Sequence, residues 1–172
     1  MVQTQQRAPL ERTQTVDGIE YRKHVASFAT GVAVVTSTTP EGDVHGVTIN
    51  SFSSISLEPP TVMISLREGR SHDAIMASGR FGVSVLTDCQ REHSVHFAGN
   101  KNQTERPDVE VRNLVPTLKE CLAWFECEVT RTVVVHDHIL IFGEVVACGS
   151  NEGDPLLFFA SQYTKRASGN EW

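Results

Sequence analysis

Two long β-prone segments, separated by only two residues, constrain the fold of this chain more than any other feature. The segments are LAWFECEVTRTVVV (Leu122–Val135) and HILIFGEVVACGS (His138–Ser150), and both are rich in β-branched and aromatic residues. Only His136 and Asp137 lie between them, a loop length typical of a tight β-hairpin. The sequence therefore predicts an antiparallel pair of strands as its longest β element.

Shorter β-prone segments precede and follow this hairpin. Their residue types predict strands over Val32–Ser37, Val44–Ser56, Thr61–Leu66, Arg80–Leu86 and Pro155–Phe159. Turn-rich stretches, Thr38–Asp43 and Asn151–Asp154, separate some of these strands. The polar stretch Ala98–Pro107 predicts a mobile surface loop.

Capping residues predict two short helices before and between these strands. Asp17, with Glu20 three residues later, forms the pattern of a capping box at the start of the first helix. Ser71 is placed to cap the second helix, and Gly79 is placed to end it.

A third helix is predicted over Cys89–Phe97, because Thr87 and Gln90 form another capping box. Six or more strands with short turns and only three short helices do not fit an alternating βαβ array. The pattern favours a mainly β fold, an antiparallel barrel with the helices packed on its outside.

Length and composition favour a single globular domain. The chain has 172 residues, of which 40% are apolar and 21% are charged, close to the average of globular proteins. Residues 1–16 are rich in Gln, Thr and Arg and have little to bury, so we expect a flexible leader there. Residues 17–172 are then expected to form the one domain.

Charge and cysteine usage exclude several classes of partner. The formal net charge is −6 and no basic stripe is visible, which argues against a nucleic-acid partner. No apolar run approaches the ~20 residues that span a bilayer, and residues 1–16 lack the apolar middle of a signal peptide. The four cysteines form no CxxC pair and no zinc pattern. We therefore expect a reduced, cytoplasmic protein without a membrane partner.

The segment Val44–Ser56 concentrates polar side chains. Its hydroxyl and amide residues are Thr48, Asn50, Ser51, Ser53, Ser54 and Ser56. On one continuous strand, alternate residues from Thr48 to Ser54 would share a face. That face would suit a ligand with many polar atoms. An ordinary half-exposed strand explains the same residues, and the residue types alone favour this simpler interpretation.

Two histidine pairs are candidates for metal binding or proton transfer. His136 and His138 flank Asp137, and His93 and His96 lie three residues apart on the third predicted helix. Neither pair has a third ligand at a recognisable spacing, so solvated imidazoles are the simpler interpretation and no metal is predicted. The sequence also lacks the G-x-S-x-G, G-x-G-x-x-G and Walker A motifs.

Seven short segments follow one another in a recognisable order. They are TGVAVVTS from Thr30, HGVTINSFSSISLEPPTVMISL from His45, FGVSVL from Phe81, HFAGNK from His96, LAWFECEV from Leu122, DHILIFGEV from Asp137 and PLLFFASQY from Pro155. The order resembles the short-chain flavin reductases, the NAD(P)H:flavin oxidoreductases that serve two-component flavin monooxygenases. The resemblance covers about Tyr21 to Tyr163. It implies a mainly β, FMN-binding split β-barrel of Greek-key type, with a few short helices packed outside, and a homodimer.

The resemblance also implies a flavin site. Its residues would be Thr30 and Gly31 at the edge, Thr48, Ile49, Asn50 and Ser51 at the isoalloxazine, Ser53 and Ser54 near the ribityl phosphate, Ser71 at a helix start, and Phe97, Ala98 and Lys101 in a loop over the phosphate. Because the chain is acidic, a local cation must hold the phosphate, and Lys101 is the obvious candidate. By the same resemblance, His138 is the catalytic residue beside the nicotinamide, and Tyr163 lies near it.

The implied reaction is hydride transfer from NADH or NADPH to FMN or FAD, with the reduced flavin passing to a partner monooxygenase. The flavin carries the electronic chemistry, so the protein needs no strong acid or nucleophile. His138 then acts through position and electrostatics rather than as a base. The alternative is a flavin-binding split-barrel protein that does not oxidise NAD(P)H efficiently.

Three departures from the family pattern fall near this site. Ser161 and Gln162 stand where relatives often carry Gly and a basic residue before the final Tyr. Residues 102–107 replace an Asp-basic-Phe element in the loop after Lys101. His136 stands where Gly commonly precedes the Asp-His pair. The last two bear on the phosphate loop and on the nicotinamide side.

Overall fold

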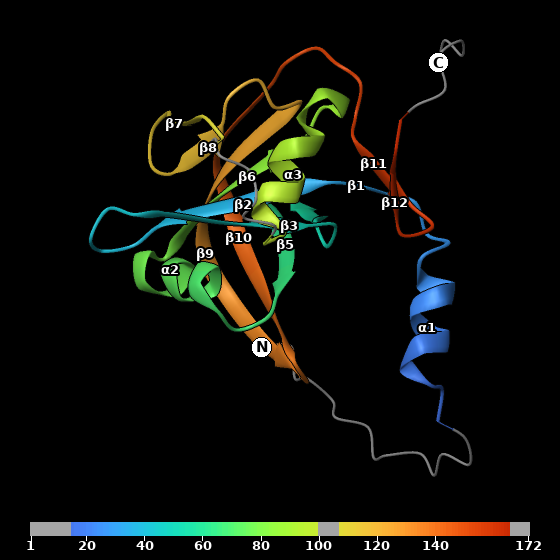
Figure 1. The fold of residues 1–172 in the computed structure, drawn as a ribbon. Coiled ribbons are helices and arrows are strands. Elements are labelled where there is room, and N and C mark those ends of the chain that lie inside the picture. Colours follow the sequence, from blue (N-terminus) through green and yellow to red (C-terminus); the bar gives the residue numbers. More distant parts are fainter. Residues whose placement is uncertain (1–14, 100–106, 166–172) are drawn as a thin grey trace.

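The computed structural model describes residues 15–99 and 107–165. Within them the helices are α1 (Gly18–Val25), α2 (Arg70–Ser78), η1 (Asp88–Gln90) and α3 (Arg91–Phe97). The strands are β1 (Thr30–Gly31), β2 (Ala33–Thr38), β3 (Val44–Ile49), β4 (Ser53–Leu57), β5 (Pro60–Leu66), β6 (Arg80–Val85), β7 (Val109–Val111), β8 (Pro116–Leu118), β9 (Ala123–Val135), β10 (His138–Ser150), β11 (Leu157–Phe159) and β12 (Gln162–Thr164). The mainly β prediction is confirmed (Figure 1). Most of the expected leader and most of the expected loop Ala98–Pro107 lie outside the described residues.

Strands β9 and β10 form the long hairpin that the sequence predicts. Their register runs from Val135 opposite His138 to Ala123 opposite Ser150. The turn residue His136 has φ 54°, a backbone conformation uncommon for a residue with a side chain. Two register shifts along the pair act as bulges, which bend and twist the strands.

Seven strands form one antiparallel sheet in the order β3-β2-β6-β9-β10-β5-β4. Strands β3 and β4 lie at opposite edges of this sheet, yet only residues 50–52 connect them. A connection of that length spans at most about 14 Å from Ile49 to Ser53. The sheet must therefore curl until its two edges approach each other, although no ladder joins β3 to β4 among the described strands.

The prediction of one continuous strand over Val44–Ser56 is wrong. The Ser51 hydroxyl donates to the Ser65 carbonyl at 2.9 Å and accepts the Ser65 N–H at 3.2 Å. This side chain thus takes the backbone groups of β5 that a continued strand would pair with. As a result Thr48 and Ser54, which alternation places on one face, lie on opposite edges of the sheet.

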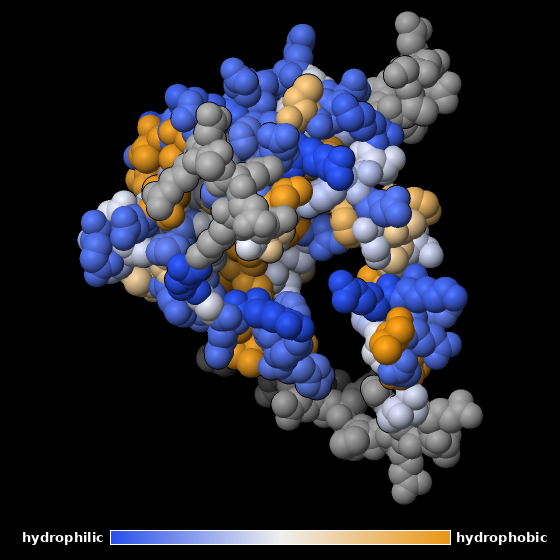
Figure 2. All heavy atoms as spheres, in the orientation of Figure 1, coloured by the Kyte–Doolittle hydropathy of each residue, from blue (hydrophilic) through white to orange (hydrophobic). Residues whose placement is uncertain are grey.

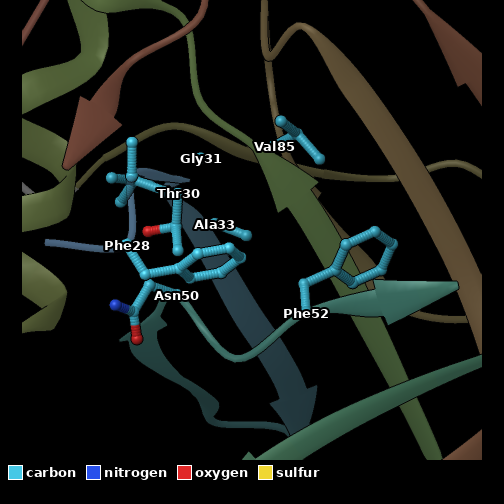
Figure 3. Close-up of a pocket in the computed structure, with 9 residues that line it drawn as sticks. Phe28, Thr30, Gly31, Ala33, Asn50, Phe52 and Val85 are labelled. Carbon is cyan, nitrogen blue, oxygen red and sulfur yellow. The ribbon is translucent and has the colours of Figure 1, made fainter. Parts of the chain in front are cut away.

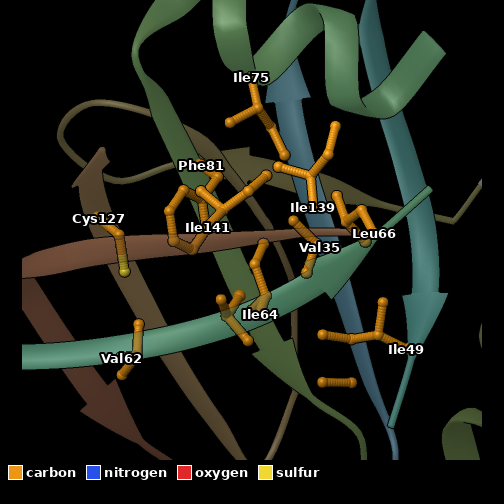
Figure 4. Packing of buried hydrophobic residues seen from close by; sticks show 12 residues of the cluster. Val35, Ile49, Val62, Ile64, Leu66, Ile75, Phe81, Cys127, Ile139 and Ile141 are labelled. Carbon is orange, nitrogen blue, oxygen red and sulfur yellow. The ribbon is translucent and has the colours of Figure 1, made fainter. Parts of the chain in front are cut away.

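The curled sheet encloses the main hydrophobic core (Figure 4). Val35, Ile64, Phe81 and Ile141 come from four different strands and are completely buried. Strand β10 passes close to one of these side chains, because a Cβ on Gly143 would lie 2.5 Å from the Phe81 ring. Only glycine therefore permits this packing, and any larger residue at position 143 would displace the ring.

Polar side chains on the other face of the sheet hold the small β7–β8 pair. The Ser84 hydroxyl accepts the Leu118 N–H at 2.9 Å. The completely buried Glu126 carboxylate accepts the Asn113 N–H at 2.9 Å. These bonds satisfy backbone groups that would otherwise be buried without partners. The segment before β9 is therefore fixed to the sheet.

Two predicted caps differ in the structure. Asp17 is the N-cap residue of α1, but its side chain makes no capping hydrogen bond, so the capping box with Glu20 does not form. Gly69, not Ser71, precedes α2, because the entry to this helix has φ 154°, which favours glycine. Ser71 lies in the first turn. Gly79 ends α2 in a left-handed conformation, as predicted.

Other predicted features agree more closely. The Thr87–Gln90 capping box is confirmed, and its short helix η1 continues into α3. The strand predicted over Pro155–Phe159 is the shorter β11, which pairs with β1 and β12. Within the described residues, no helix is long and apolar enough to cross a membrane.

The cysteine thiols differ in burial and therefore in their expected reactivity. Cys127 is 1% exposed, and burial raises the pKa of its thiol to about 12, so the reactive thiolate is scarce. Cys121 is also buried, whereas Cys148 is exposed. We expect iodoacetamide at mildly alkaline pH to alkylate Cys148 in the native protein, and Cys121 and Cys127 only after denaturation. Peptide mass spectrometry checks this, and equal native labelling of Cys127 and Cys148 would contradict it.

Candidate functional site

A cavity of about 240 Å³ opens where the segment around β1 meets the β3–β4 linker (Figure 3). Its lining residues are Phe28, Ala29, Thr30, Gly31, Val32, Ala33, Asn50, Phe52 and Val85. Typical ligand pockets measure roughly 300–1,000 Å³. The cavity in one chain is therefore large enough for part of a cofactor, not for the whole of a dinucleotide.

Strand β1 forms one wall of the cavity. It pairs with β11, with Thr30 opposite Phe158 and Gly31 opposite Leu157. The Thr30 hydroxyl oxygen is buried and has no hydrogen-bond partner within the described residues. Buried polar groups nearly always have a partner, so this hydroxyl is suited to a ligand in the cavity.

The opposite wall is the β3–β4 linker. Asn50 follows the last residue of β3, and its amide is exposed at the cavity. Phe52 lines the cavity too and packs against Phe125, with ring centroids 5.4 Å apart. Phe28 lines the cavity as well and is 76% exposed. Aromatic rings beside a free amide and a free hydroxyl suit a flat heterocycle with polar edges.

Three other residues predicted at the flavin ring use their side chains elsewhere. The Thr48 hydroxyl donates to the Ser94 carbonyl at 2.6 Å. Ile49 belongs to the main core. Ser51 bonds the backbone of β5, as described above. These residues can therefore meet a ligand only through main-chain groups.

The remaining predicted flavin residues do not line the cavity. Ser53 and Ser54 lie on the edge strand β4, Ser71 is half-buried in the first turn of α2, Phe97 ends α3, Ala98 follows it at the surface, and Lys101 lies outside the described residues. Phe97 has a packing role, since a Cβ on Gly46 would lie 2.5 Å from its ring.

His138 lies at the tip of the β9–β10 hairpin, where Asp137 links it to Arg67 through two side-chain contacts. Its Nδ1 is 2.9 Å from Asp137 Oδ1, while Arg67 donates to Asp137 Oδ2 at 2.8 Å. The hydrogen bond from His138, with the charge of Arg67, lowers the pKa of the Asp137 carboxyl. Asp137 therefore stays ionised and orients the imidazole, leaving Nε2 directed away from this pair.

Tyr163 is held on β12 by three contacts. Its hydroxyl is 2.8 Å from the Ser94 hydroxyl, and its ring packs edge-on against Phe158 at 5.5 Å. The Arg91 guanidinium lies 5.5 Å from the ring centroid. The side chain is therefore fixed against α3 before any ligand binds.

Neither histidine pair forms a metal site in the described part of the chain, where no three His, Cys, Asp or Glu side chains converge. His136 lies in the hairpin turn and His138 begins β10, so the two do not share a strand face. His93 is partly buried in α3, and this burial lowers its pKa, which favours the neutral imidazole.

Comparison with known proteins places this geometry in a family. Residues 25–167 match the model of the flavin reductase like domain. The chain belongs to the flavin reductase family. It is 50% identical over 152 residues to the NADH-dependent flavin reductase StyB of Pseudomonas fluorescens, covering 86% of this chain and 89% of the relative.

Two further comparisons agree with this family membership. The FMN reductase (NADH) SmoA of Agrobacterium fabrum is 39% identical over 140 residues, with 80% of each chain covered. The solved structure of the styrene monooxygenase flavin reductase SMOB from Pseudomonas putida S12 superposes with a TM-score of 0.82 at 50% identity, covering 87% of this chain and 99% of that one.

Sequence reasoning missed two aromatic residues of the flavin reductase cavity. Phe28 follows Ile19 and Val25 at roughly helical spacing, and this spacing indicated a helix residue rather than a cavity residue. Phe52 appeared as one apolar residue of a long strand. The available signal was the position of each ring, two residues before Thr30 and two residues after Asn50 in sequence.

Proposed function

We propose that the protein reduces free flavin, FMN or FAD, by hydride transfer from NADH or NADPH, and supplies the reduced flavin to a partner monooxygenase. The cavity carries this proposal, because it combines Phe28 and Phe52 with the unpartnered Thr30 hydroxyl and the free Asn50 amide. Two relatives named as NADH-dependent reductases and the reductase of styrene monooxygenase support it. The protein is then an NAD(P)H:flavin oxidoreductase.

The residues of the cavity fit the isoalloxazine end of a flavin. Phe28 and Phe52 offer apolar surfaces to a flat ring, while Asn50 and Thr30 offer hydrogen bonds to its polar edge. Gly31 adds no side chain, and nothing lies within 4 Å of where its Cβ would stand. Main-chain groups of residues 48–51 complete the contact.

The phosphate end is assigned to the remaining residues of the expected flavin site. These are Ser53, Ser54, Ser71, Phe97, Ala98 and Lys101, as expected from the family resemblance. Ser71 lies in the first turn of α2, a helix of nine residues whose free N–H groups favour an anion. Lys101 supplies the cation in an acidic chain.

Bound flavin would supply the redox chemistry by accepting a hydride from the nicotinamide. The protein's part is to position two flat rings and to stabilise charge. The Asn50 amide would donate a hydrogen bond where negative charge develops on the ring. His138, oriented by Asp137, and Tyr163 are assigned to the nicotinamide. No step requires a strong base.

We further propose that residues 17–172 form one split β-barrel domain of Greek-key type. The curled seven-stranded sheet, open between β3 and β4, supports this description. All four thiols are free, which fits a reducing, cytoplasmic location.

A homodimer completes the proposal. Helix α1 buries no residue, and Ile19, Tyr21 and Phe28 are 80%, 62% and 76% exposed. Figure 2 shows α1 and its apolar side chains standing away from the body across an open gap. A second copy seated in this gap would cover these side chains and would also add a wall to the small cavity beside Phe28.

The function is tested by mixing the purified protein with FMN or FAD and NADH or NADPH. We expect the absorbance of the reduced nicotinamide to fall at a rate that saturates with flavin. Retention of flavin colour without nicotinamide oxidation would instead indicate a flavin carrier, and the reductase assignment would fail.

Replacing His138 with Ala should impair nicotinamide use more than flavin binding. We expect KM for NADH to rise about tenfold, which corresponds to the loss of one ring contact or hydrogen bond. Flavin affinity, measured by fluorescence titration, should stay within the error of the wild type. A collapse of flavin affinity with intact NADH kinetics would contradict this placement.

Asn50→Asp tests the flavin side of the site in the same assays, whereas His138→Ala tests the nicotinamide side. A carboxylate beside the ring would repel the charge that develops on reduction and would remove a donor. We expect weaker flavin binding and a lower kcat, with KM for NADH little changed. Unchanged turnover and affinity would show that the linker does not face the ring.

Association is tested with Ile19→Asp. A charge on the apolar face of α1 should convert the dimer to a monomer in light scattering and raise KM for flavin. His24→Asp is the matched control, because it adds one negative charge at an already polar, exposed position of α1 that is five residues from Ile19 and not on its i, i+4 face. A wild-type monomer, or equal effects of the two variants, would contradict the dimer.

A further inference from the structure

One buried serine on α3 is bonded to segments from both walls of the cavity. Ser94 is completely buried, although its element is a surface helix. Its carbonyl accepts the Thr48 hydroxyl at 2.6 Å, and its hydroxyl is 2.8 Å from the Tyr163 hydroxyl. These two bonds reach strands that are 115 residues apart in sequence (163 − 48).

The first bond leads to the linker wall. Thr48 lies on β3, two residues before Asn50. Only Ile49 separates them, and its side chain is packed in the core. Asn50 therefore directly follows a strand whose end is fixed by the bond between Thr48 and Ser94.

The second bond leads to the β1 wall. Tyr163 on β12 is opposite Phe158 on β11, and Phe158 is opposite Thr30 on β1. A continuous hydrogen-bonded ladder thus connects the tyrosine to the cavity hydroxyl. Figure 1 shows β11 and β12 beside β1, at the side of the molecule to which α1 is attached.

Other contacts hold the same hairpin against η1 and the end of α1. Lys165 forms an ion pair with Asp88 at 2.9 Å, which lowers the pKa of Asp88. Ala160 in the turn donates its N–H to the Ala26 carbonyl at 2.8 Å. The β11–β12 hairpin is thus a fixed block, and Ser94 is the residue that bonds this block and β3 at once.

We infer that Ser94 is a positioning residue that sets the separation of the two cavity walls, and with it the fit of the flavin ring. This inference rests on the proposed function. Dispersion contacts to a flat ring weaken steeply when a gap of 0.5–1 Å opens, so a small shift of one wall reduces affinity. Ser94 touches no ligand itself and acts through Asn50 and Thr30.

Ser94→Ala tests the inference. Loss of one hydrogen bond should raise KM for flavin by about 3- to 10-fold and weaken flavin binding in the absence of nicotinamide by the same factor. The KM for NADH should change less than the KM for flavin, because His138 has no bond to Ser94 and Tyr163 keeps its contacts with Phe158 and Arg91. A merely structural role would lower the melting temperature without this split between the two KM values.

Ser37→Ala is the matched control. Ser37 is 1% exposed and its hydroxyl is 2.9 Å from the Ser78 hydroxyl, so it resembles Ser94 in burial and bonding. It lies four residues beyond the cavity residue Ala33 on β2, about 13 Å along the strand. We expect Ser37→Ala to lower the melting temperature similarly and to leave both KM values unchanged.

Tyr163→Phe removes the other partner of the bond and keeps the aromatic ring. It should reproduce the rise in KM for flavin, and the double variant should be no worse than either single variant, because the bond is already lost. Independent, multiplying effects, or unchanged flavin KM in Tyr163→Phe, would overturn the inference. If Ser94→Ala does not fold, Tyr163→Phe alone still tests the inference. Absence of flavin reduction by the wild type would overturn the proposed function instead.

Discussion

The short linker between β3 and β4 is the constraint on which the rest of the structure depends. Three residues carry the chain from one edge of a seven-stranded sheet to the other, which is possible only if the sheet curls. The Ser51 hydroxyl fixes the linker to the backbone of β5. The same curl encloses the core around Phe81 and leaves the linker at the mouth of the cavity, so fold and site have a common cause.

The sequence predicted the features that depend on neighbouring residues. The β9–β10 hairpin, the Thr87–Gln90 capping box and the glycine stop of α2 all follow from local chemistry, and all are present. Three of the residues that the family resemblance assigns to the flavin, Thr30, Gly31 and Asn50, line the cavity. What these cases share is a signal contained within a few positions of the chain.

Features that depend on distant contacts could not be predicted in this way. The alternation over Val44–Ser56 is compatible with one strand, and nothing in it reveals that the Ser51 side chain bonds Ser65. The short pair β7–β8 is stabilised by Glu126 and Ser84 from the sheet, not by its own residues. Ser94 gave no signal at all, because its bonds to Thr48 and Tyr163 exist only in the folded chain.

Helix α1 lies close to the cavity along the chain, and this has a consequence for ligand binding. Isolated helices shorter than about 12–15 residues are marginal in water, and α1 has eight residues, none of them buried. Its order therefore depends on whatever covers it. Phe28 lies three residues after the last residue of α1 and forms part of the cavity. Occupation of the cavity and ordering of α1 thus involve neighbouring residues, and if a ligand at Phe28 favours the ordered helix, the ordered helix favours that ligand to the same extent.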